Sequence, residues 1–201
     1  MKKSSFHSVI LLCFSIALIQ CGGVSEEEYA QSIKEHRDAI DVFMRSADAS
    51  PFLSGNLPFQ PLDYFAPDPS FNITASYQPI GNRKVRNLTT SNGQEEAYEE
   101  YGYAFFDLNG QHHQLLILKN LNAQADFFIP FADASNGQST YGGGRYLNVP
   151  MGNIESTIEL DFNKAYNPYC AYNATYICPL PPASNILRIP ILAGEKNYTT
   201  N

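Results

Sequence analysis

The chain has 201 residues, and its 13 lysines and arginines are outnumbered by 20 aspartates and glutamates, which gives a net charge of −7. A chain with this net negative charge would be repelled by the phosphate backbone of nucleic acid and by anionic lipid headgroups. The charge therefore excludes nucleic acid as a partner and electrostatic binding to anionic lipid. Aromatic residues make up 13% of the chain and charged residues only 16%. Together with frequent glycine and proline, this composition favours strands joined by turns within one domain.

Residues 1–20 have the layout of a secretion signal, because two lysines precede an apolar run that is too short to span a bilayer. The run ends in "LIQC", which resembles the lipobox of bacterial lipoproteins, although Gln20 stands where a small residue is usual. We therefore expect a signal peptide at 1–20, a lipid on Cys21, a tether at 21–24 and one domain at 25–201. The expected location is the cell envelope, with a lipid anchor in the outer membrane, facing the periplasm or the surface.

The first predicted element of the mature chain is an amphipathic helix. Ser25 followed by Glu28 is the pattern of a capping box, in which each side chain binds the other residue's backbone N–H. Apolar residues then recur at steps of three and four, which predicts a helix of about 20 residues. A proline- and aromatic-rich segment follows, and we expect it to cover the domain without regular structure.

From residue 71 onward the apolar period becomes two, which is typical of strands. Turn signals at 91–93 and at Asn109-Gly110 divide the region 83–120 into three strands. Further strands are predicted in 71–77, 126–131, 145–151, 154–162 and 185–193. The predicted fold is therefore mainly β, with helix only at its edge: an antiparallel curled sheet, barrel- or sandwich-like, with one N-terminal amphipathic helix.

Alternation within two of these strands predicts where polar groups point. In "IESTIELDF" the apolar residues share one face, so Asp161 lies on the other face, toward solvent, a cleft or a covering segment. In "ILRIPILA" Arg188 lies opposite the apolar face, and Pro190 predicts an edge strand or a bulge.

Three blocks resemble the DUF1684 family of uncharacterised bacterial and archaeal proteins. They are the helix followed by "SPF", the block with "TYGGGRYL", and the block that runs from "DFNKAYNPYCAY" through "CPLPP" to "AGEK". The resemblance covers about residues 26–196. Members usually read "FRD" where this chain has Phe131-Ala132-Asp133, so any role of that arginine does not carry over. The resemblance implies no activity.

Cys170 and Cys178 are separated by seven residues. A metal site needs about four ligands, and the few histidines include an adjacent pair that faces opposite ways along a strand. A catalytic cysteine would need a histidine base, which nothing in the sequence pairs with it. A disulfide fits an extracytoplasmic address and would close a short loop, with a stabilisation of roughly 2.6 kcal/mol. We therefore expect a disulfide, no metal and no cofactor.

Polar and glycine residues gather in two motifs that are candidates for a binding site. The glycines of "STYGGGRY" allow positive φ and close approach, and successive amides can cradle an anion. The alternative is a bulged turn in which Arg145 braces an acid such as Asp161. The amides of "DFNKAYN" either bind a ligand or cap turns. The predicted ligand-binding residues are Tyr141, Gly143, Gly144, Arg145, Asp161, Asn163, Tyr166 and Asn167.

Three functions follow from these candidates. The first is a membrane-anchored lipoprotein that binds a small polar or anionic ligand, or a partner, in a polar cleft. The second is a hydrolase-like enzyme in which Asp161 and Glu195 divide acid and base roles while Arg145 holds the substrate. The third is a structural envelope protein. The arrangement of Arg145, Asp161 and Glu195 distinguishes them, since an open cleft favours ligand binding or hydrolysis and a closed ion network favours neither.

Overall fold

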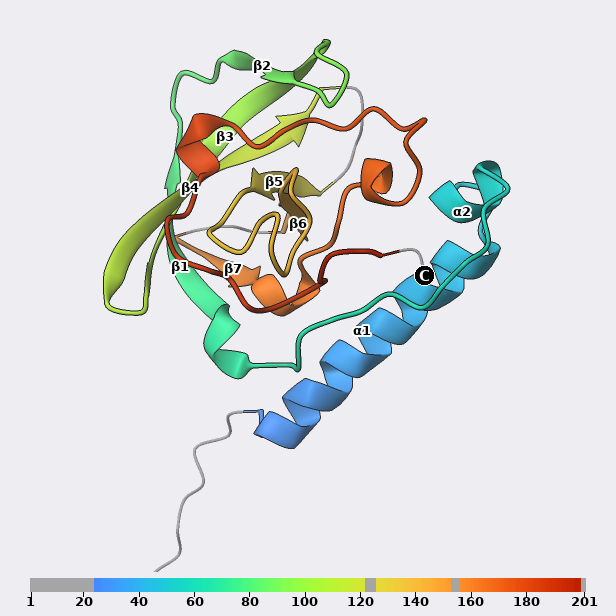
Figure 1. Ribbon diagram of the computed structural model, residues 1–201. Helices are drawn as coiled ribbons and strands as arrows, with labels where there is room; N and C mark the ends of the chain where they lie inside the picture. The colour runs from blue at the N-terminus through green and yellow to red at the C-terminus, as the bar shows by residue number, and fades with distance from the viewer. Residues whose placement is uncertain (1–23, 122–125, 153–155, 200–201) are drawn as a thin grey trace, which may run out of the picture.

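The computed structural model describes residues 24–121, 126–152 and 156–199 (Figure 1). The predicted signal peptide and Cys21 lie outside these residues. None of the helices in the described ranges is long and apolar enough to cross a membrane.

Helix α1 (Glu26–Ser46) begins where the capping box predicts. The Ser25 hydroxyl accepts from the Glu28 N–H, and the Glu28 carboxylate accepts from the Ser25 N–H at 2.9 Å. The predicted apolar stripe faces the domain, and its residues Ile33 and Met44 are buried. A second short helix, α2 (Pro51–Ser54), turns the chain back and buries Phe52.

Within the described residues, seven strands form one antiparallel sheet. They are β1 (Asn72–Pro79), β2 (Val85–Thr89), β3 (Glu95–Leu108), β4 (Gln111–Asn120), β5 (Phe127–Phe131), β6 (Arg145–Val149) and β7 (Thr157–Asp161). The order is β6-β5-β4-β3-β1-β7, with β2 added to one end of the long β3. The sheet curls into a half-barrel that brings its two edge strands, β6 and β7, into contact, while α1 lies across one side (Figure 1). The prediction of a curled antiparallel sheet with one N-terminal helix is confirmed, and the sheet is barrel-like.

The hairpin between β3 and β4 shows why its turn was predictable. Asn109 and Gly110 both have positive φ, 53° and 72°, which is the backbone of the tight turn that Asn-Gly favours. The turn fixes the register, so Leu108 pairs with Gln111 and the alternation of both strands follows from it.

The predicted strand at 185–193 is not a strand in the structure. Pro190 cannot donate to a ladder, and the carbonyl groups of Ile191 and Ala193 bind the Arg145 side chain instead of a neighbouring strand. Only an isolated bridge joins Ile186 to Ala132. The predicted alternation nevertheless holds, because Leu187, Ile189 and Ile191 are buried and Arg188 is exposed.

The main core fills the concave side of the sheet, and its largest fully buried apolar side chains include Phe131, Leu115, Ile117, Leu160 and Phe162. A second cluster joins α1, α2 and the covering segment to Tyr172. A third lies on the face of β4 opposite the main core and includes Tyr98 of β3 and Leu118 of β4. This third cluster positions the pocket described below.

Candidate functional site

Arg145, a predicted ligand residue, is fully buried at 0% exposure. Its Nη2 lies 2.9 Å from Asp133 Oδ2 and donates to the Ile191 carbonyl at 2.7 Å. Its Nη1 donates to the carbonyls of Ala193 and Glu195. The guanidinium therefore ties β6 to the C-terminal segment 191–195, and it braces Asp133 rather than the Asp161 considered from the sequence.

Glu195 is also buried, at 1% exposure, and its carboxylate is surrounded by donors. Asn167 donates to it from its backbone N–H at 2.9 Å and from its side-chain amide at 2.8 Å, and the Tyr172 hydroxyl lies 2.6 Å from one of its oxygens. Burial raises the pKa of Glu195 to about 7, against the opposing effect of these hydrogen bonds. Arg145 and Glu195 thus lie in a closed network inside the wall of the domain.

Asp161 has a different set of partners. It is 7% exposed, and its strand face meets helix α1 rather than solvent. Its Oδ1 accepts from the Tyr29 hydroxyl at 2.7 Å, and Lys164 Nζ lies 3.1 Å from its Oδ2. Asn163 is fully buried, and its amide donates to the Tyr29 hydroxyl and to the Asp68 carbonyl, each at 2.8 Å. These residues fasten α1 and the covering segment to the end of β7.

The glycines of "TYGGGRY" also serve the fold. Gly144 has φ +87°, and a Cβ there would lie 2.7 Å from the Phe131 carbonyl oxygen and 2.6 Å from a Pro181 carbon. A Cβ at Gly143 would meet the Tyr141 ring at 2.6 Å. At Gly144 the backbone therefore packs closely against Phe131 and Pro181.

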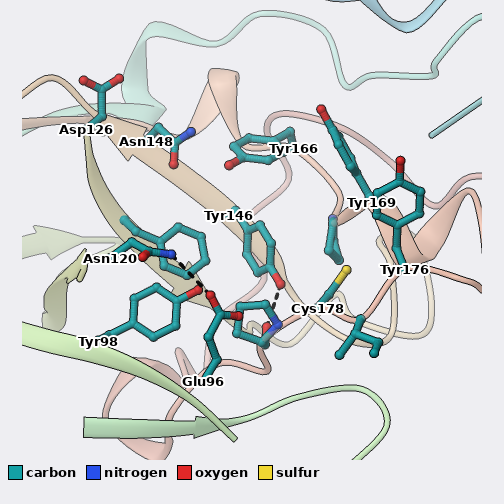
Figure 2. A pocket seen from close by; sticks show the side chains of 14 residues that line it. Glu96, Tyr98, Asn120, Asp126, Tyr146, Asn148, Tyr166, Tyr169, Tyr176 and Cys178 are labelled. Atoms are coloured by element: carbon teal, nitrogen blue, oxygen red, sulfur yellow. Dashed lines mark hydrogen bonds between the residues drawn. The ribbon is translucent and has the colours of Figure 1, made fainter. Parts of the chain in front are cut away.

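An open pocket of about 570 Å³ lies elsewhere, on the outer face of β3, β4, β5 and β6 (Figure 2). Its floor follows the strand register, in which Tyr98 pairs with Asn120, and Phe128 with Asn148. The Tyr98 and Phe128 rings stack with centroids 5.4 Å apart, and Tyr146 meets Phe128 edge-on at 4.7 Å. The volume is within the range of small-molecule sites.

The remaining wall comes from the segment that follows β7. Tyr166 meets Tyr146 edge-on, and Tyr169 meets Tyr176 in the same way. The full lining is Glu96, Tyr98, Asn120, Asp126, Phe128, Tyr146, Asn148, Tyr166, Pro168, Tyr169, Tyr176, Ile177, Cys178 and Pro179. Tyr166, Tyr169 and Asn148 also line a neighbouring cavity of about 350 Å³ beneath α1.

Of the predicted ligand residues, Tyr166 lies in this pocket. Arg145, Asn163 and Asn167 are fully buried, and Asp161 lies under α1. The sequence reasoning missed the strand residues that form the pocket floor. A signal existed, because Glu96 and Tyr98, and likewise Tyr146 and Asn148, are two residues apart and so share one face of a strand.

Cys178 lies at the edge of the pocket, and Cys170 donates its backbone N–H to the Cys178 sulfur at 3.1 Å. The predicted disulfide is not formed in the structure, where both are free cysteines. The hydrogen bond between the two thiols is the main cause that lowers the pKa of Cys170 and raises that of Cys178. Within the described ranges, no group of three or more His, Cys, Asp or Glu side chains is placed to hold a metal ion.

These features define a class of protein: a curled antiparallel half-barrel, closed by an N-terminal helix, with an aromatic pocket on the outside of the sheet. The chain belongs to the DUF1684 family of proteins of unknown function, whose model matches residues 58–196. The solution NMR structure of an uncharacterised protein of Haloarcula marismortui is similar, with 33% sequence identity and a TM-score of 0.66. That similarity covers 85% of this chain and 95% of the other. No curated protein matches the chain.

Proposed function

We propose that the protein is a membrane-anchored lipoprotein outside the cytoplasm whose domain binds a small polar ligand in the aromatic pocket. The observation that carries the binding function is the pocket itself, because about 570 Å³ of open space is lined by five tyrosines and a few convergent polar groups. The hydrolase alternative loses its support, since Glu195 and Arg145 are closed off from solvent and their partners are internal.

The proposed location rests on the sequence around Cys21. Val24 is exposed and α1 begins at Glu26, so a short tether is all that separates the domain from the lipid-bearing residue.

The proposed cellular location is tested in a bacterial host. Globomycin, which blocks lipoprotein signal peptidase, is expected to leave a larger precursor in the membrane fraction. A precursor size that does not respond to globomycin would contradict the proposal of a lipoprotein.

The binding function is tested by filling the pocket. Asn148 is exposed on β6 and lines the pocket, so Asn148→Trp places an indole in that space. Thermal unfolding is measured with neutral, cationic and anionic small molecules, from glucose and choline to inorganic phosphate. We expect at least one probe to raise the midpoint by several degrees in the wild type and not in Asn148→Trp, because a ligand stabilises only the state that binds it.

The matched control is Gln114→Trp, an exposed position on β4 outside the pocket lining. It should retain the ligand response. If no probe raises the midpoint, or if the rise survives in Asn148→Trp, the pocket is not a ligand site.

A further inference from the structure

The charge of the pocket restricts what it can bind. The described residues that line it include two carboxylates, Glu96 and Asp126, and no lysine, arginine or histidine. An anion would meet repulsion there without a compensating cation. A ligand that carries positive charge would meet attraction from both carboxylates.

The hydroxyl groups of the lining tyrosines are largely occupied within the protein. Tyr146 donates to the Pro179 carbonyl at 2.6 Å, Tyr98 hydrogen bonds Glu96, and Tyr166 hydrogen bonds the Asn148 side chain. Burial raises the pKa of all three phenols, so their rings stay neutral at physiological pH. A ligand would therefore contact mainly the faces and edges of these rings and not their hydroxyl groups.

The two carboxylates lie at different edges of this group of rings. In Figure 2 Asp126 lies above Tyr166 and Tyr146, and Glu96 lies below them beside Tyr98. Asp126 on the rim is exposed, while Glu96 is half-buried and accepts from Asn120 at 3.2 Å. The group of rings therefore has a carboxylate at each of two edges.

Aromatic faces combined with carboxylates and few free hydrogen-bond groups suit one chemical class. The negative face of an aromatic ring attracts a cation, and several rings around one site recognise quaternary ammonium groups, which have no N–H to satisfy. A sugar would need several free donors and acceptors, whereas Tyr98, Tyr146 and Glu96 already bind internal partners. An inorganic anion is disfavoured by the charge.

We infer that the pocket binds an organic ammonium ion, such as a quaternary ammonium headgroup. The tyrosine faces would contact the ion, and Glu96 and Asp126 would balance its positive charge. This inference rests on the proposed ligand-binding function and names the class of ligand.

The test compares choline with 3,3-dimethylbutan-1-ol, its uncharged isostere, by titration calorimetry of the full chain in a nonionic detergent. Because the two molecules have the same shape, the difference in their affinity measures the contribution of the charge. Choline is expected to bind about tenfold more tightly or better. Asp126→Asn and Glu96→Gln should each weaken choline severalfold and leave the isostere unchanged.

The matched control variant is Glu95→Gln, since Glu95 is exposed on β3 and its side chain points to the opposite face from Glu96. It should bind choline as the wild type does. Equal affinity for choline and the isostere, or binding of glucose or phosphate without choline, overturns the ammonium inference and leaves the ligand-binding function standing. Absence of binding by every probe overturns both.

Discussion

Replacing Arg145 with methionine is expected to destabilise the domain by about 3–5 kcal/mol, since removing one partner of a buried ion pair leaves the other charge uncompensated. Here Asp133 would remain buried without its cation, and the carbonyls of Ile191, Ala193 and Glu195 would lose their donor. Against a typical total of about 5–15 kcal/mol, this loss leaves a marginally folded protein. Urea unfolding followed by circular dichroism measures it.

Arg145→Lys separates charge from geometry at the same position. Lysine keeps the positive charge but cannot present a planar fork to a carboxylate and several carbonyls at once. We therefore expect most of the loss to remain in this variant.

The control for both variants is Arg83→Met, because Arg83 pairs with Glu99 at 3.7 Å on the surface with both side chains partly exposed. Such pairs contribute about 0–1 kcal/mol. If Arg145→Met behaves like this surface variant, the buried network does not hold the C-terminal segment to β6.

The sequence predicted elements whose causes are local. The start of α1 follows from Ser25 and Glu28, and the turn between β3 and β4 follows from Asn109 and Gly110, because these residues set the backbone by themselves. The alternation of Leu187 and Ile189 was also predictable, although the segment is irregular. A burial pattern depends only on the side chains of the segment. A strand also needs the free edge of a neighbouring strand with which its backbone can form hydrogen bonds.

The candidate site was harder to predict because its partners are distant in sequence. Arg145 looked like a ligand residue beside three glycines, but its carboxylate partner is Asp133 and its carbonyl partners lie at 191–195. No local sequence pattern predicts such pairings. The pocket is difficult to predict for the same reason, since Tyr98, Phe128 and Tyr146 become neighbours only when three strands align.

Glu195 should make the stability of the domain fall as pH rises. Its pKa is about 7 in the folded protein, above the value of about 4.3 for an unfolded glutamate. Below pH 4.3 the carboxyl group is protonated in both states and its contribution is fully present. Between about pH 4.3 and 7 only the folded state holds the proton, so this contribution is lost progressively, by about 4 kcal/mol in all.

Glu195→Gln isolates this effect. The carboxamide cannot ionise, and it turns an N–H₂ group toward donors of Asn167 or Tyr172, so the variant is expected to be less stable by about 1–3 kcal/mol at low pH. The gap between wild type and variant should then narrow as pH rises toward 7, as urea titrations at several pH values would show. Glu95→Gln, at an exposed position on β3, is the surface control. A gap for Glu195→Gln that widens with rising pH would mean that the donors outweigh burial and hold Glu195 as an anion, in which case the network is a charged one throughout.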